Sequence, residues 1–170
     1  MVLPNTRKVE LEKINELLSN KRGIYFWFNK ADNSLVYIGI AVGVGGLKKR
    51  IAQQHLNPKY LEYRDEKHTS KDEYQLKYAI PRLSRKNGGT KLGIDKSAFR
   101  KSIGRMLSLK PGNETVNYIQ LKLRLEVFES EDIVMVKNIE KSLISTCQPK
   151  FNSANKILNK TLQPTANRGS

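Results

Sequence analysis

The stretch Gly23-Ile24-Tyr25-Phe26-Trp27-Phe28-Asn29 is followed, after five residues, by Leu35-Val36-Tyr37-Ile38-Gly39-Ile40. Both stretches are rich in aromatic and β-branched residues, which favour strands. The five residues between them include Asp32, Asn33 and Ser34, which are typical of turns. The sequence therefore predicts an antiparallel hairpin with strands over 23–29 and 35–40.

Strand periodicity predicts which side chains of this hairpin share a face. With residues 30–34 as the loop, Tyr25 is expected opposite Gly39 and Trp27 opposite Tyr37, which places both phenols on one face. Because Gly39 has no side chain, we expect it to let a substrate backbone approach Tyr25. The alternative is that two tyrosines on one hairpin face are ordinary amphipathic packing.

The rest of the chain predicts an α+β fold, with a small antiparallel sheet of about three strands flanked by helices. Residues 117–128 alternate apolar and polar side chains, as a half-buried strand does. Residues 131–147 have helical spacing, and Ser130 is the expected N-cap. Further helices are expected over 9–18, 47–55, 72–83 and 97–109.

The length of 170 residues suits one domain. We expect an N-terminal helical arm over 1–21, a main domain over 22–152 and a flexible tail over 153–170. Residues 57–116 are expected to form a basic, helical insertion within the main domain.

Charge is the strongest compositional signal. The formal net charge is +15, and residues 45–110 alone hold 17 Lys or Arg against 6 Asp or Glu. Such a surface attracts polyanions by counterion release, which points to a nucleic acid as the partner. The competing interpretation is a protein that is merely basic, such as a ribosome-associated factor.

Several protein classes are excluded by composition. The single cysteine, Cys147, excludes an internal disulfide and a Cys-rich zinc module. No apolar run is long enough to span a membrane, and the first residues lack the apolar core of a secretory signal. These features predict a cytoplasmic protein with no membrane partner.

The two tripeptides Gly23-Ile24-Tyr25 and Tyr37-Ile38-Gly39, separated by eleven residues, resemble the signature of the GIY-YIG nucleases. That family places an arginine on the helix after the second strand, and Arg50 matches this position. The resemblance covers roughly residues 22–56 and 117–152. It implies a GIY-YIG-like fold and metal-assisted hydrolysis of phosphodiester bonds, with Tyr25 activating water and Tyr37 or His55 assisting.

Glu140 and Asn152 complete the resemblance. Family members carry a metal-binding glutamate on a helix near the C-terminus, which implies that Glu140 binds one Mg²⁺, with Mn²⁺ as a substitute. Glu140 also borders the apolar stripe of its helix, where an unpaired carboxylate is costly. The alternative is an ion pair between Glu140 and Lys137. Asn152, after Pro149, matches a family asparagine that would contact a phosphate or orient a catalytic group.

His55 follows Arg50 by five residues. Restriction enzymes of this family carry a histidine just after the arginine, which implies that His55 accepts a proton from Tyr25 or contacts a phosphate. On an ideal α-helix, however, positions five apart differ by about 140°. Arg50 and His55 therefore share a site only if the helix ends or bends near Gln54.

Contacts to double-stranded DNA are expected from basic residues on the 47–55 helix, in the insertion and on the 97–109 helix. The candidates are Lys48, Lys49, Arg82, Arg85, Lys86, Arg100, Lys101 and Arg105. The resemblance favours a compact type II restriction endonuclease, which cuts both strands as a homodimer on DNA or by two sequential nicks. Two alternatives stay open: a homing or repair-type nicking nuclease, and a catalytically silent DNA-binding module on the same fold.

Overall fold

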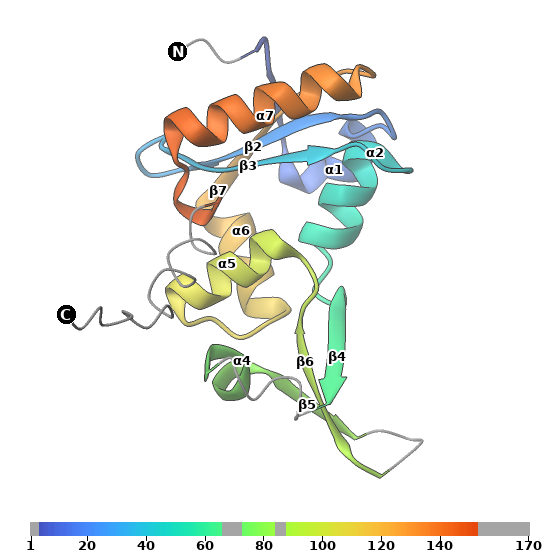
Figure 1. Cartoon of the computed structure of the whole chain (residues 1–170), viewed down its shortest axis with the longest axis vertical. Coiled ribbons are helices and arrows are strands. Elements are labelled where there is room, and N and C mark those ends of the chain that lie inside the picture. The colour runs from blue at the N-terminus through green and yellow to red at the C-terminus, as the bar shows by residue number, and fades with distance from the viewer. Residues whose placement is uncertain (1–3, 66–72, 84–87, 153–170) are drawn as a thin grey trace, which may run out of the picture.

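Two antiparallel sheets and the helices around them make up an α+β fold, seen in a computed structural model that describes residues 4–65, 73–83 and 88–152. The first sheet has the strand order β1-β7-β2-β3 and the second has the order β4-β6-β5 (Figure 1). The strands are β1 (Arg7–Val9), β2 (Gly23–Asn29), β3 (Leu35–Ala41), β4 (Leu61–Asp65), β5 (Ile80–Leu83), β6 (Thr90–Asp95) and β7 (Leu123–Glu129). The helices are η1 (Leu11–Lys13), α1 (Ile14–Leu17), α2 (Gly46–Lys48), η2 (Lys49–His55), α4 (Glu73–Tyr78), α5 (Ala98–Leu107), α6 (Asn113–Lys122) and α7 (Ile133–Cys147).

The predicted hairpin is confirmed. Strands β2 and β3 pair antiparallel, with Tyr25 opposite Gly39 and Trp27 opposite Tyr37. Strand β7 pairs with β2 on its other side and with β1 beyond it. The first sheet thus has four strands rather than the expected three, because β1 was not recognised in the sequence.

Both faces of the first sheet are covered (Figure 1). Helix α7 packs on one face, where Ile24, Phe26 and Ile38 lie with Val136 and Leu143 in one apolar cluster. The opposite face carries Tyr25, Trp27 and Tyr37, which belong to a larger cluster with residues of η2, α5 and α6. Strand alternation therefore places Tyr25 and Tyr37 on the face of the sheet opposite α7.

Three expectations need correction. Of the helix expected over 9–18, only residues 11–17 are helical, as η1 and α1, and Val9 belongs to the strand β1. The strand expected over 117–128 begins only at Leu123, because residues 113–122 form α6, which buries Thr115, Val116 and Ile119 at helical spacing. The N-cap of α7 is Asp132, whose side chain accepts a hydrogen bond from the Met135 amide, and not Ser130.

The insertion is not purely helical, which corrects the expected fold class. Residues 73–78 form α4, but the chain then enters β5, the edge strand of the second sheet. Pro81 explains the change, since proline breaks a helix interior and is tolerated on an edge strand. None of the described helices is long and apolar enough to cross a bilayer.

Candidate active site

Tyr25 and His55 form a buried pair at the centre of the site. The hydroxyl of Tyr25 lies 2.8 Å from Nε2 of His55. Both side chains are 2% exposed. Burial lowers the pKa of His55 well below its ordinary value, and the positive charges of Arg50 and Arg100 lower it further. His55 is therefore neutral at neutral pH and has a lone pair available for a proton.

An unusual helix brings His55 to Tyr25. Residues 49–55 form a π-helix, and the amide of Leu56 donates to the carbonyl of Ile51 five residues earlier at 2.9 Å. This wider turn brings positions five apart close to one another, unlike an α-helix. Arg50 and His55 both lie on η2, and the positive charge of Arg50 lowers the pKa of His55. The π-helix also ends at His55, directly after Gln54, so the expectation that the helix ends near Gln54 is met.

Tyr37 lies beside Tyr25 on the same face of the sheet. The ring centres are 6.2 Å apart, and Tyr37 is half-buried. Burial raises the pKa of Tyr25 well above its ordinary value, as does the neighbouring Tyr37, whereas Arg50 opposes the rise. Burial also raises the pKa of Tyr37. Both phenols are therefore protonated at neutral pH, and either needs a proton acceptor to become a phenolate.

Glu140 lies on α7, the helix that packs on the sheet face opposite the two tyrosines. Its side chain is half-buried, and its negative charge raises the pKa of both Tyr25 and Tyr37. Burial raises the pKa of Glu140 itself, while Arg50 lowers it. Across the described residues Glu140 forms no hydrogen bond or ion pair, so the alternative pairing with Lys137 is not found.

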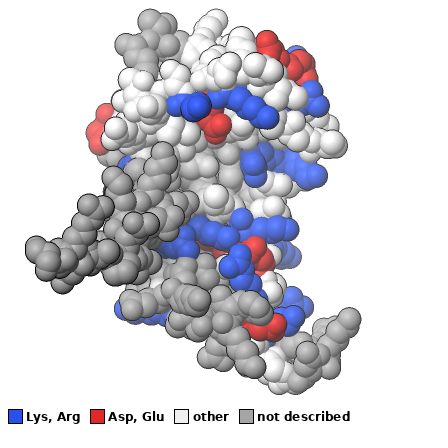
Figure 2. All heavy atoms as spheres, viewed as in Figure 1, with Lys and Arg blue, Asp and Glu red and all other residues white. Residues whose placement is uncertain are grey.

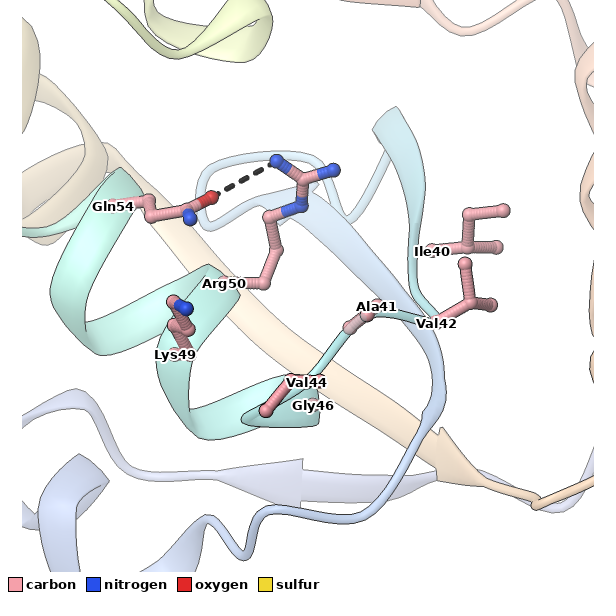
Figure 3. A pocket seen from close by; sticks show the side chains of 9 residues that line it. Ile40, Ala41, Val42, Val44, Gly46, Lys49, Arg50 and Gln54 are labelled. Atoms are coloured by element: carbon pink, nitrogen blue, oxygen red, sulfur yellow. Dashed lines mark hydrogen bonds between the residues drawn. The ribbon is translucent and has the colours of Figure 1, made fainter.

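Arg50 is exposed at the mouth of the site. Its Nη1 donates to Oε1 of Gln54 at 2.9 Å. Beside it lies a hollow of about 390 Å³, which Arg50 and Gln54 line from η2 and residues 40–44 line from β3 and the following loop. Figure 3 shows the Arg50 side chain projecting from its helix on one side of this hollow, with Ile40 and Val42 on the other side. A guanidinium in this position is accessible to an incoming phosphate.

Gly39 has a different function from the one expected. A Cβ built on Gly39 would lie 2.3 Å from the hydroxyl oxygen of Tyr25 and 2.4 Å from its Cζ. The space is therefore filled by the Tyr25 ring, and no substrate backbone can occupy it. Gly23 is required for a similar reason, since its Cβ would lie 2.2 Å from the carbonyl oxygen of Phe128 on β7.

Asn152 supports the strand and does not point into the site. Its Oδ1 accepts from the amide of Ile38, and its Nδ2 donates to the carbonyl of Ile38, both at 2.8 Å. Ile38 lies between Tyr37 and Gly39 on the edge strand β3. Asn152 therefore braces the part of β3 that carries Tyr37, and its expected contact with a phosphate stays a prediction.

The proposed DNA contacts divide into three groups. Arg100 is wrong as a contact, because it is completely buried and paired with Asp95. Lys49 and Arg82 are exposed, and the Arg82 guanidinium lies 5.1 Å from the centre of the Tyr63 ring. Lys48, Lys101 and Arg105 are half-buried, and Lys101 pairs with Glu62 at 3.1 Å. Arg85 and Lys86 lie outside the described residues.

Two functional candidates were missed by sequence reasoning. Oγ of Ser97 lies 2.8 Å from Nδ1 of His55, on the ring edge opposite Tyr25. Asp95, two residues before Ser97, accepts a hydrogen bond from Nε of Arg100. The sequence places Ser97 at the start of a helix, where serine is a common N-cap, but nothing in it indicates that a residue 42 positions after His55 touches the imidazole.

The donor set was tested for a fit to Mg²⁺. Within residues 4–65, 73–83 and 88–152, no group of three or more His, Cys, Asp or Glu side chains could hold a metal ion. Mg²⁺ does not need such a group, because it keeps several waters and is commonly held by one or two carboxylates together with substrate phosphates. A single half-buried carboxylate without a protein partner, Glu140, fits that mode of binding.

The chain was compared with known proteins in three ways. No protein-family model, no curated protein and no solved structure matched it.

Proposed function

We propose that this protein is a metal-dependent DNA endonuclease of the GIY-YIG type. The observation that carries the proposal is the buried hydrogen bond of 2.8 Å between the Tyr25 hydroxyl and Nε2 of His55. A protonated phenol next to a neutral imidazole is a donor and an acceptor in direct contact. Such a pair can generate a phenolate base within a protein interior.

The proposed steps begin with this pair. The O–H bond of Tyr25 breaks, its proton passes to Nε2 of His55, and the phenolate takes a proton from a water molecule that attacks phosphorus. As the new P–O bond forms, the P–O bond to the leaving oxygen breaks, and the proton held at Nε2 of His55 passes through solvent to that oxygen. Tyr37, beside it, orients that water. Arg50 stabilises the negative charge that develops on the phosphoryl oxygens. A bound phosphate also offsets the Arg50 charge that lowers the pKa of His55, which favours protonation of the imidazole.

Glu140 is the proposed ligand of Mg²⁺, for which Mn²⁺ can substitute. The metal, when bound, polarises the scissile phosphate and neutralises charge on the leaving oxygen. Glu140 is suited to hold it because its carboxylate lies close enough to both phenols to act on their pKa values. Burial keeps this carboxylate partly out of water, which strengthens its attraction to a divalent cation.

Double-stranded DNA is the proposed substrate. Lys and Arg side chains predominate over acidic ones on the face seen in Figure 2, in keeping with the net charge of +15. Arg50 and Lys49 lie exposed beside the site on the same helix. Among nucleases of this type we favour a type II restriction enzyme. One chain offers one site, so that cutting of both strands requires a homodimer or two successive nicks.

Plasmid cleavage tests this proposal. Supercoiled plasmid is incubated with Mg²⁺ and the wild-type protein, Tyr25→Phe or Glu140→Gln. We expect discrete fragments with the wild type and a rate about 10²–10⁴-fold lower with Tyr25→Phe, the usual contribution of acid–base catalysis. Tyr118→Phe, half-buried on α6, and Glu16→Gln, exposed on α1, are the matched controls and should cleave like the wild type.

The products separate the competing functions. Discrete linear fragments support a restriction enzyme, whereas open-circular plasmid alone points to a nicking nuclease of the homing or repair type. Plasmid that is retarded but intact with wild type and variants alike would leave only a DNA-binding module. Mg²⁺ should also raise the melting temperature of the wild type but not that of Glu140→Gln, because a ligand stabilises only the protein that binds it.

A further inference from the structure

The imidazole of His55 is held from both sides. Nε2 faces the Tyr25 hydroxyl, and Nδ1 lies 2.8 Å from Oγ of Ser97. Ser97 is 3% exposed and is the N-cap of α5, where its Oγ accepts the amide of Arg100 at 3.3 Å. The three side chains thus form a continuous buried chain from α5 through η2 to β2.

Ser97 is held in place by a buried ion pair. Arg100 donates through Nε to Oδ1 of Asp95 at 2.8 Å, and its Nη2 binds the same oxygen. Asp95 in turn accepts the Gly112 amide at 3.0 Å and the Thr115 hydroxyl at 2.9 Å. Every oxygen of this carboxylate is therefore occupied, as a buried charge requires.

Arg100 also fixes the end of the π-helix. Its Nη1 donates to the carbonyl of Gln54 at 3.1 Å and to the carbonyl of Asn57, and its Nη2 donates to the carbonyl of Tyr60 at 3.3 Å. Gln54 immediately precedes His55. One guanidinium therefore positions both the backbone that carries His55 and the helix end that carries Ser97.

This arrangement favours one of the two neutral forms of the imidazole. A neutral histidine carries its proton on one nitrogen, and the partner of that nitrogen selects the form. Ser97 Oγ accepts the Arg100 amide, and its second lone pair allows it to accept from Nδ1 as well. A proton on Nδ1 satisfies this oxygen and leaves the lone pair of Nε2 directed at the Tyr25 hydroxyl.

We propose that Ser97 is a positioning residue that holds His55 in the form protonated at Nδ1, so that Nε2 is free to accept the Tyr25 proton. On transfer the Tyr25 O–H bond breaks and an Nε2–H bond forms, while Nδ1–H stays donated to Ser97. The phenolate and the imidazolium are then an ion pair. The part that concerns proton transfer rests on the proposed nuclease function, whereas the form of the imidazole does not.

Long-range ¹H–¹⁵N correlation spectra of the histidine rings test this inference in the free protein. The chain has two histidines, and His68→Gln identifies the signals of His55. We expect a pyrrole-like Nδ1 and a pyridine-like Nε2 in the wild type. Ser97→Gly should shift the ring toward protonation at Nε2, because it removes the hydroxyl while glycine still serves as an N-cap at a cost of a few tenths of a kcal/mol.

Two further variants separate positioning from helix capping. Ser97→Thr restores a hydroxyl and should return the wild-type pattern, and Ser102→Ala, at a buried serine on the same helix, should not change it. A wild-type ring protonated at Nε2, or a ring that Ser97→Gly leaves unchanged, overturns the proposal. If the spectra behave as expected, kcat for plasmid cleavage should fall about 10–100-fold in Ser97→Gly, as for other partners that orient a histidine.

Failure of the two proposals is distinguishable. If neither the wild type nor any variant cleaves DNA but the spectra change as expected, the nuclease function fails and the positioning of His55 stands. If the wild type cleaves DNA and Ser97→Gly cleaves equally fast with an unchanged ring, the nuclease function stands and Ser97 is only a helix cap.

Discussion

The hydroxyl oxygen of Tyr25 lies where a side chain on Gly39 would be, with 2.3 Å between that oxygen and the position of a Cβ. The two residues are directly opposite each other on β2 and β3. Tyr25 can therefore lie flat across the neighbouring strand and reach His55 only because residue 39 is glycine.

Replacing Gly39 with alanine should displace Tyr25 from His55. The added methyl group overlaps the ring of a buried side chain, and overpacking of this kind costs about 1–3 kcal/mol. We expect a loss of plasmid cleavage close to that of Tyr25→Phe, together with a lower free energy of unfolding. Urea unfolding can be followed by the fluorescence of Trp27, the single and fully buried tryptophan.

Gly89→Ala, far from the hollow beside Arg50, is the matched control for this change. A Cβ at Gly89 has no neighbour within 4 Å, and its φ is not positive. Equal effects of the two alanine substitutions would show that the close approach of Tyr25 to Gly39 does not matter.

Arg100→Met should destabilise the protein strongly. The substitution leaves Asp95 buried and charged without its partner, which typically costs about 3–5 kcal/mol. Lys101→Met, at the next position, removes only a partly exposed pair with Glu62 and should cost about 0–1 kcal/mol. Urea unfolding of both variants measures the difference, and similar values for the two would contradict a structural function for Arg100.

His55 should make stability depend on pH. Burial lowers its pKa in the folded protein, so the unfolded chain binds more protons as the pH falls below the unfolded pKa of about 6.5. Its contribution is fully present above about pH 6.5 and is lost as the pH decreases toward the folded pKa. The free energy of unfolding should fall with a slope approaching about 1.4 kcal/mol per pH unit.

His55→Gln is the comparison for this slope, measured by urea unfolding between about pH 5 and pH 8. Four charged or polar groups act on His55 directly: Tyr25 on β2, Arg50 on η2, and Ser97 and Arg100 at α5. Tyr37 on β3 and Glu140 on α7 act on Tyr25. The variant should have a shallower slope over this range. Identical slopes would mean that His55 binds protons equally in the folded and unfolded chain, so that burial does not lower its pKa.

Asn152→Ala should loosen the edge of the first sheet. It removes two hydrogen bonds to Ile38 and leaves a partly buried amide and carbonyl without a partner, for a cost of about 1–3 kcal/mol. Because Ile38 separates Tyr37 from Gly39, cleavage should fall as well. Asn138→Ala, exposed on α7, is the control. Normal stability combined with lost cleavage would instead indicate a direct function for Asn152 in catalysis.

The hairpin and its register were predictable because strand periodicity and turn residues act locally. The same holds for the face shared by Tyr25 and Tyr37 and for the helix that carries Glu140. Each depends on the side chains of one or two neighbouring segments, and the structure has them as expected.

The remaining features depend on distant contacts. The burial of Arg100 follows from Asp95 and from three backbone carbonyls 40 to 46 residues earlier in the chain. The alternation of residues 117–122 is equally compatible with a helix, and burial of Ile119 among residues of other elements selected the helix. No local pattern distinguishes a π-helix from an α-helix over Lys49–His55, although this difference brings His55 to Tyr25.

The strand order β1-β7-β2-β3 has a consequence for biosynthesis. Of the three strands that are synthesised first, β1 and β2 do not pair with each other. The strand that lies between them, β7 (Leu123–Glu129), is translated about a hundred residues after β2. Until then the nascent hairpin has an open edge and an uncovered aromatic face, and a lone hairpin is barely stable in water. A nascent chain that stalls before residue 123 therefore exposes an unpaired edge strand. Prematurely terminated chains are expected to aggregate through this edge.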